Sequence, residues 1–347
     1  MRALRYGFVP PYVIAALARS DLADVNAAAL TTEKESVRLR VHREHRRTEP
    51  GVSVVPETPS AAGARSVYDS GSAFAQRVGD PVRGEGDPAT GDRDADDAYD
   101  FAGSVRAYFR TEHGRDSVDG AGLPLILNVH YGVRYMNAFW DGDEMTFGDG
   151  DGRVFVGFAR SLDVVAHELG HGVTQFETGL VYRGQSGALN EHYSDVWGAA
   201  ITQFVEGTDA ASADWLIGDE VLAPGLEGQA LRSMKAPGTA YDNPLMGIDP
   251  QPAHMRDYYG GPDDNQGVHI NSGIPNRAFY LTALSIGTDA AAGIWYAAQA
   301  NLAPRADFND AVAALTATAA SRVATGQAPD GSERRVRQAF AEVGLPA

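Results

Sequence analysis

The sequence predicts an α+β fold of two domains, in which a mixed domain of helices and strands is followed by a mainly helical one. Between residues 67 and 158, short runs rich in β-branched and aromatic residues are separated by Gly/Asp turns, which is typical of strands. After Ser161, apolar residues recur at intervals of three and four, which is typical of helices with one buried face. Residues 1–50 have a composition of their own and predict a leader ahead of both domains.

Four segments follow from these changes of composition. We expect the leader at residues 1–50, a linker at 51–66, the α+β domain at 67–180 and the helical domain at 181–347. The linker is rich in Pro, Gly, Ser, Thr and Ala, so it should be exposed and open to proteolytic nicking.

Individual elements can be assigned within this plan. In the leader, the spacing of Thr32 and Glu35 is that of a capping box and predicts a helix that runs to Glu44. The α+β domain should contain a helix over 95–112 and strands over 125–131, 134–140 and 153–158. Later helices are expected over 162–177, 190–205, 272–286, 290–301, 308–325 and 333–343.

Bulk composition excludes several classes of function. The net charge of −17 argues against nucleic acid as a partner. No run approaches the roughly 20 apolar residues of a membrane-spanning helix, so we expect no membrane partner, and we expect a monomer. Residues 1–23 imitate a secretory signal, but Pro10 and Pro11 interrupt the apolar run, which makes a cleaved signal peptide a poor interpretation.

Charge is distributed unevenly between the leader and the rest of the chain. Residues 1–50 hold nine Lys and Arg against six Asp and Glu, whereas the whole chain carries −17. A basic leader beside an acidic body favours electrostatic docking of one on the other, although an unrelated solvated tail would have the same composition.

Two histidines have the spacing of metal ligands. His167 and His171 lie four residues apart in an apolar-periodic segment, so both side chains should project from one helix face, with Glu168 beside them. Glu191 on the next expected helix can supply a third ligand, and Asp195 lies one turn further on. Each carboxylate taken alone is more typical of a solvated helix face than of a metal ligand. Together they match a catalytic zinc site with three protein ligands, and the absence of Cys excludes thiolate ligands.

Charge then suggests a chemistry for the site. Zinc lowers the pKa of a bound water toward neutrality, and Glu168 can accept the proton that the water gives up. Asp195 can accept the outer N–H of a zinc-bound histidine and fix its tautomer. The sequence therefore predicts one Zn²⁺ that activates water for hydrolysis.

Several segments resemble the motifs of the thermolysin family of zinc metalloendopeptidases, in the same order along the chain. They are Asn137–Gly142, Asp163–His171, Gly187–Glu191, Leu231–Met234 and Gly267–Gly273. The resemblance implies the two-domain thermolysin-like zincin fold, with the active-site helix in the cleft between the domains. It also implies cleavage of internal peptide bonds before bulky hydrophobic residues, near neutral pH.

The leader resembles the short propeptide of the protealysin-like subgroup through residues 8–13, Phe-Val-Pro-Pro-Tyr-Val. This likeness implies a zymogen that processes itself, and we expect the cut between Arg46 and Ser66. Pro10, Pro11 and Tyr12 should form a stiff extended segment that occupies the cleft; the alternative is a disordered start.

The resemblance also implies roles for further residues. His269 should donate to the oxyanion, oriented by Asp264 and assisted by Tyr182. Arg232 should bind a substrate carbonyl. The side chain of Asn137 and the backbone of Ala138 should hold the peptide extended. A prime-side pocket should be lined by Phe155, Phe158, Val164 and Leu231, each of which is equally typical of core packing.

Calcium is doubtful on the same comparison. Asp163, Asp214 and Asp219 match calcium ligands of the family, but Thr202 and Leu216 stand where acids are expected. Because Ca²⁺ takes six to eight oxygen ligands, the loss of two carboxylates weakens such a site.

The rival interpretations are a zinc exopeptidase and a catalytically silent binding protein. An exopeptidase would need a carboxylate placed to bind the free amine of its substrate, and no motif supplies one. A silent protein would usually lack Glu168 or His269, and both are present.

Residues 243–259 form an insertion that either reshapes the cleft or is a surface loop. We expect secretion, with a cytoplasmic location as the alternative.

Overall fold

A computed structural model describes residues 7–48 and 64–346. Its α-helices are α1 (Pro11–Leu17), α2 (Ala23–Thr48), α3 (Arg93–His113), α4 (Leu162–Glu177), α5 (Gly184–Glu206), α6 (Asp263–Asn271), α7 (Gly273–Ile286), α8 (Thr288–Gln299), α9 (Phe308–Ala324) and α10 (Ser332–Glu342). Short 3₁₀ helices lie at Phe158–Arg160 and Met255–Asp257. None of the described helices is long and apolar enough to cross a membrane.

One five-stranded sheet lies on the N-terminal side of the site, in the order β2-β1-β3-β5-β4. Its strands are β1 (Arg65–Asp69), β2 (Arg83–Gly84), β3 (Leu125–Val129), β4 (Ala138–Trp140) and β5 (Met145–Phe147). β1, β3 and β5 run parallel, while β2 and β4 are antiparallel to their neighbours. β4 is therefore an edge strand, with one side of its backbone open to another segment.

Two-stranded ribbons complete the strands. They pair β6 (Leu216–Ile217) with β7 (Arg232–Ser233), and β8 (Asp242–Asn243) with β9 (Gly247–Ile248).

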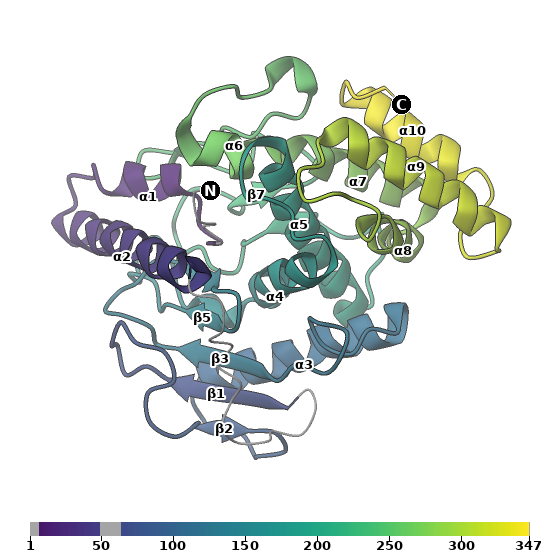
Figure 1. The fold of residues 1–347 in the computed structure, drawn as a ribbon. Helices are drawn as coiled ribbons and strands as arrows, with labels where there is room; N and C mark the ends of the chain where they lie inside the picture. The colour runs from purple at the N-terminus through teal and green to yellow at the C-terminus, as the bar shows by residue number, and fades with distance from the viewer. Residues whose placement is uncertain (1–6, 49–63, 347) are drawn as a thin grey trace.

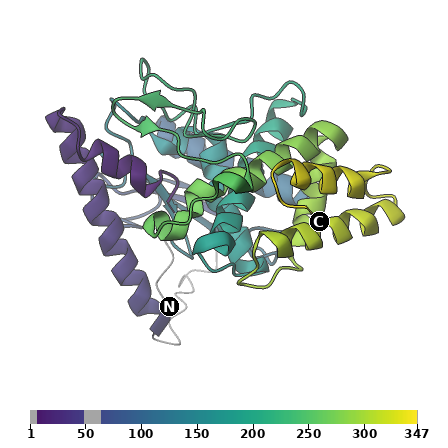
Figure 2. The same cartoon turned by 90° about the horizontal axis from the view of Figure 1, so that it is seen from above.

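α4 and α5 form the centre of the molecule. α3 packs against β1 and β3, α4 packs against α3 and β4, and α5 packs along α4 (Figure 1). The last helices lie beyond α5, on the side opposite to the leader helices α1 and α2 (Figures 1 and 2). Every residue of α4 from Leu162 to Thr174 is buried, so this helix carries ionisable side chains into the interior, where they require partners.

The predicted helices of the two domains are confirmed with small shifts at their ends. The helix expected at 162–177 has those bounds, and α5 begins at Gly184, six residues before the expected start. The strand expected at 125–131 is β3. The predicted α+β class is thus confirmed, with the five-stranded sheet formed by residues before α4 and a mainly helical chain after it.

Other sequence assignments were wrong. Residues 134–140 form a strand only from Ala138, and 153–158 form none, because Phe155 makes a single bridge to Leu222. Just before the expected strand 153–158, Gly150 has a φ of 69°, and a Cβ there would lie 2.3 Å from the carbonyl oxygen of Phe155. The chain therefore turns back tightly on itself at this position. Arg65 and Ser66, expected in the linker, belong to β1.

The leader helix α2 begins at Ala23, nine residues before the predicted capping box. Thr32 and Glu35 do not cap it. The Thr32 hydroxyl accepts the backbone N–H of Met136 at 3.0 Å, and the Glu35 carboxylate accepts the Tyr131 hydroxyl at 2.7 Å. Both side chains are buried and attach the leader to the chain just before β4.

The described ion pairs between leader and body have the opposite polarity to the expected one. Asp24 in the leader pairs with Arg153 at 2.9 Å and with Arg134 at 3.7 Å. Arg38 donates to the Phe74 carbonyl oxygen at 2.8 Å. The structure does not describe the basic side chains from Arg40 to Arg47. Among the described residues, the leader is attached through the buried contacts of Thr32 and Glu35 rather than through its net charge.

The three acids proposed as calcium ligands line one cavity of about 380 Å³ beside α4 and α5. Thr202 and Leu216 line the same cavity. Among the described residues, the three carboxylates do not form a group with ligand atoms within 4.8 Å of one another. Burial and the nearby carboxylates of Asp163 and Asp214 raise the pKa of Asp219 to about 6. The carboxylates of Asp163, Asp214 and Asp219 therefore repel one another in this cavity.

We expect Asp219→Asn to raise the Tm at pH 8 by about 1–2 °C. The folded state disfavours the Asp219 anion, so this cost is present above pH 6 and disappears as the pH falls toward the unfolded value near 4. Thermal unfolding at pH 8 and pH 4.5 measures it, with exposed Asp330→Asn as the control. A larger gain in Tm from added Ca²⁺ than from the substitution would instead indicate a calcium site.

We also expect Thr32→Val to weaken the attachment of α2. The substitution leaves the buried Met136 N–H without its acceptor, at a cost of about 1–3 kcal/mol. Hydrogen exchange of the segment that contains Met136 should accelerate in the full chain. Thr31→Val is the matched control, because the Thr31 hydroxyl bonds only to the Ala27 carbonyl within the helix; equal acceleration in both variants would contradict the prediction.

Candidate active site

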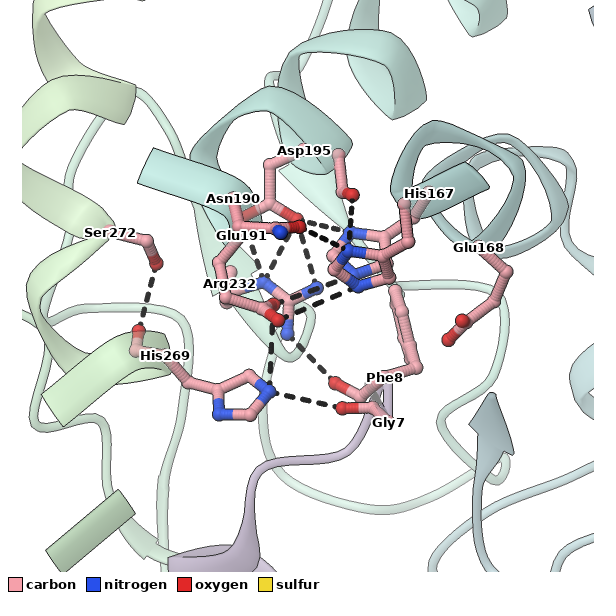
Figure 3. A network of polar contacts seen from close by, with 12 residues as sticks. Gly7, Phe8, His167, Glu168, Asn190, Glu191, Asp195, Arg232, His269 and Ser272 are labelled. Atoms are coloured by element: carbon pink, nitrogen blue, oxygen red, sulfur yellow. Dashed lines mark hydrogen bonds and ion pairs between the residues drawn. The ribbon is translucent and has the colours of Figure 1, made fainter. Parts of the chain in front are cut away.

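His167, His171 and Glu191 converge at the contact between α4 and α5. Figure 3 shows His167 and Glu191 at this point. Their ligand atoms all lie within 4.8 Å of one another, and all three side chains are buried. Oε2 of Glu191 lies 3.5 Å from Nε2 of His167, and Oε1 lies 3.5 Å from Nε2 of His171. The i, i+4 spacing on α4 thus produces the shared face that the sequence predicted.

The outer nitrogens of both histidines are held by side chains of α5. Nδ1 of His167 lies 2.8 Å from Asp195, and Nδ1 of His171 lies 2.7 Å from Asn190 and 3.0 Å from the Ser194 hydroxyl. These contacts leave the Nε2 atoms facing the centre of the cluster. Asp195 has the position predicted for it. Asn190 and Ser194 were not predicted, although Asn190 lies within the motif Gly187–Glu191 and Ser194 directly precedes Asp195.

Burial and charge set the protonation of the cluster. Burial lowers the pKa of His171 to about 3, so its ring is neutral. Burial also opposes charge on His167, but the carboxylates of Asp195 and Glu191 outweigh it and raise its pKa to about 9. Burial would raise the pKa of Glu191, yet the surrounding histidines, His269 first, lower it. The carboxylate is therefore ionised and able to bind a cation.

The donor set fits zinc. Tetrahedral zinc with bonds of about 2.0–2.1 Å places its ligand atoms roughly 3.3–3.4 Å apart. The two 3.5 Å separations from Glu191 are close to that value. Nε2 of His167 and Oε2 of Glu191 are buried, and neither has a hydrogen-bond partner among the described residues. A cation that bound both atoms would remove the cost of burying them without partners.

Glu168 lies beside the cluster, fully buried on the same turn of α4. Its Oε2 accepts the backbone N–H of Trp140 in β4 at 2.7 Å. This contact fixes the carboxylate between the metal-binding helix and the edge of the sheet.

A second histidine system faces the cluster from α6. Nε2 of His269 lies 3.5 Å from Glu191 and 3.1 Å from the Tyr182 hydroxyl, which also bonds to Glu191. Nδ1 of His269 lies 2.6 Å from Asp264. Burial lowers the pKa of His269, but Glu191 and Asp264 outweigh it and raise the value to about 8, so the ring is a donor at neutral pH.

The chain before His269 turns in the left-handed sense. Residues 264–267 have φ values between 51° and 78°, and three of the four are not glycine. The Asp264 carboxylate accepts the backbone N–H groups of His269 and Ile270, which holds this unfavourable turn in place.

Arg232 in β7 is fully buried and links Asp195 of the metal site to Phe8 of the leader. Nη2 and Nε donate to Asp195 at 2.9–3.2 Å, and Nη1 donates to the carbonyl oxygen of Phe8 at 3.0 Å. Burial opposes its charge, but Asp195 and Glu191 raise the pKa of the guanidinium above its ordinary value.

Residues Gly7 to Val9 of the leader lie at the site, and Figure 3 shows Gly7 and Phe8 beside His269 and Arg232. The carbonyl oxygen of Gly7 lies 3.0 Å from Nε2 of His269. The N–H of Phe8 donates to the Ala138 carbonyl oxygen at 3.0 Å. Val9 donates to Oδ1 of Asn137 at 2.8 Å, and its carbonyl oxygen accepts from Nδ2 at 3.2 Å.

The Phe8 ring fills an apolar pocket beside the metal cluster. It packs edge-on against His167, with ring centroids 5.2 Å apart, and against Phe158 at 6.4 Å. A Cβ at Gly218 would lie 2.8 Å from the ring, so glycine makes room for it. The other residues predicted for the pocket are fully or almost fully buried in the same apolar cluster: Phe155, Val164 and Leu231.

One prediction about the leader was wrong. Pro11 and Tyr12 are not extended, because Pro11 begins α1 and proline is favoured in the first turn of a helix. The segment in the cleft is Gly7–Val9, directly before the two prolines. The expected cut between Arg46 and Ser66 falls mostly outside the described residues.

Residues 243–259, which we expected to be an insertion, contact the helix that carries His269. Nε2 of Gln251 donates to the His269 carbonyl oxygen at 2.7 Å and to the Ser272 hydroxyl at 3.1 Å. The N–H of Met255 donates to the Val343 carbonyl oxygen at 2.8 Å. The insertion is therefore more than a surface loop, since it contacts the helix of His269.

Comparison with known proteins agrees with this geometry. Residues 31–175 match the family model described as thermolysin metallopeptidase, catalytic domain, and residues 178–345 match its alpha-helical domain. An extracellular metalloprotease of Pectobacterium carotovorum subsp. carotovorum is 47% identical over 291 residues, which are 83% of this chain and 82% of that protein.

Two further relatives extend the comparison. Thermolysin of Alicyclobacillus acidocaldarius subsp. acidocaldarius is 39% identical over 74% of this chain and 46% of its own length. The solved precursor of protealysin, a metalloproteinase from Serratia proteamaculans, superposes with a TM-score of 0.87 at 40% identity, covering 98% of this chain and all of that one. The chain belongs to the thermolysin family of zinc metalloendopeptidases, and its likeness is to the protealysin precursor.

Proposed function

We propose that this metalloendopeptidase cuts internal peptide bonds on the amino side of bulky hydrophobic residues. The supporting observation is the position of Phe8, whose ring fills the pocket beside His167 while its backbone is bonded at both ends. A substrate in the same register would place its scissile carbonyl where the Gly7 carbonyl lies, beside His269.

The chain's own residues then have distinct roles. The substrate residues on the carboxyl side of the scissile bond are held extended, as an added strand is held at a sheet edge. Ala138, Asn137 and Arg232 provide the hydrogen bonds. When bound, zinc polarises the scissile carbonyl and lowers the pKa of the attacking water. Glu168 accepts the proton of that water and passes it to the leaving nitrogen.

The negative charge that develops on the oxygen of the scissile carbonyl is stabilised by hydrogen-bond donors from His269 and Tyr182. His269 donates from Nε2, with Asp264 holding the opposite nitrogen. The Tyr182 hydroxyl is 3.1 Å from the same Nε2 and assists. Such fixed donors stabilise an oxyanion without reorganisation during the reaction.

Glu168→Gln should abolish cleavage of an internally quenched peptide with Phe or Leu after the scissile bond. Loss of the general base should lower kcat by about 10²–10⁴-fold. Zinc content should remain one per chain, because the ligands are unchanged, and a chelator should silence the wild type until zinc is restored. Exposed Glu112→Gln is the matched control. A zinc-loaded, leader-free wild type that cuts nothing would favour the silent binding protein.

We further propose that the chain is a zymogen which removes its own leader. The leader occupies the substrate position through Gly7–Val9 and is attached separately through Thr32 and Glu35. The linker at 51–66 and the division of the remaining chain into 67–180 and 181–347 belong to the same proposal.

On incubation with zinc, the wild type should acquire a new N-terminus between residues 46 and 66. The Glu168→Gln chain should stay intact under the same conditions, since it lacks the general base. N-terminal sequencing and intact mass measure both. An intact Met1 end alongside full activity would refute self-processing.

Release from the cell is proposed from the relatives, one of which is named an extracellular metalloprotease; a cytoplasmic location is the alternative. We propose that the protein acts as a monomer on protein and peptide substrates.

A further inference from the structure

The backbone before and within β4 presents polar groups to the cleft at every second residue. The N–H of Trp140 donates to Glu168, the carbonyl oxygen of Ala138 accepts from Phe8, and the N–H of Met136 donates to Thr32. The intervening residues face the interior: the carbonyl oxygens of Asn137 and Tyr135 accept from Gly148 and Gly150. Although β4 begins at Ala138, the alternation of hydrogen-bonding groups therefore continues to Met136, two residues beyond the bond that holds Phe8.

The leader runs antiparallel to this edge, since Phe8 is bonded to Ala138 and Val9 to Asn137. The next matching position would pair residue 10 with Met136. The leader does not reach it as a strand, because Pro10 has no N–H and its carbonyl oxygen accepts from Val13 and Ile14 in the first turn of α1.

A different part of the leader covers the position instead. The Thr32 hydroxyl bonds to Met136 at 3.0 Å, and both residues are 0% exposed. α2 thus supplies the acceptor that an extended peptide would have supplied. The precursor covers the edge in two pieces, through the backbone of Phe8 at Ala138 and through the Thr32 side chain at Met136.

We infer that, once the leader has left, the Met136 N–H is a further substrate-binding group. It takes the backbone carbonyl oxygen of the third residue after the cut bond. This inference rests on the proposed function and adds a subsite to it. Because the contact is to the backbone, it selects for a peptide that extends at least three residues beyond the cut, whatever the side chain there.

The test uses the self-processed wild type and three internally quenched peptides with Phe after the scissile bond. In the first, all bonds are amides. In the second, an ester replaces the amide between the third and fourth residues after the cut, which weakens the third carbonyl as an acceptor. In the third, the ester lies one residue further on, where the carbonyl faces away from the edge.

We expect the second peptide to lose about 3–10-fold in kcat/KM, the range of one neutral hydrogen bond, and the third to match the all-amide peptide. Equal kcat/KM for all three peptides, or equal losses for both esters, would overturn the subsite. The all-amide peptide reports on the endopeptidase activity by itself, so the subsite can fail while the proposed function stands.

Discussion

The buried carboxylate of Asp195 is the interaction on which both halves of the site depend. It bonds to the outer nitrogen of His167 and to the guanidinium of Arg232, and it accepts from Asn276. Burial disfavours its charge, but Arg232 and His167 outweigh this and lower its pKa to about 2. One anion thus orients a metal ligand and balances the cation that holds the bound peptide.

That arrangement explains why α4 can be buried on every side. A buried ion pair is tolerated only when its remaining hydrogen-bonding groups are satisfied. Here α5, β7 and α7 each provide a partner through Asp195, Arg232 and Asn276. The rigidity that follows keeps the inner nitrogens of the histidines aimed at one point, which a catalytic metal requires.

The leader shows how a short segment can block such a site. Gly7–Val9 uses the same groups that are proposed to hold a substrate, and Phe8 occupies the apolar pocket. The two prolines that follow end the strand and begin α1, so the chain turns away from the edge. α2 then returns to cover Met136. Occupation of the cleft and attachment of the leader are therefore divided between two contacts that lie far apart in the sequence.

The sequence by itself determined the metal ligands, because His167 and His171 are neighbours on one helix face by the period of the helix alone. It also determined the helices from residue 162 onward except α6, since their apolar spacing is regular, whereas residues 264–267 of α6 have left-handed backbone angles. Only the tertiary structure decided where the strands lie, because β4 and β5 have three residues each and tight glycine turns interrupt the pattern around them. Likewise, the spacing of Thr32 and Glu35 is typical of a helix cap. In the structure their side chains instead form hydrogen bonds with Met136 and Tyr131. Local spacing cannot reveal such bonds, because they join residues about a hundred positions apart.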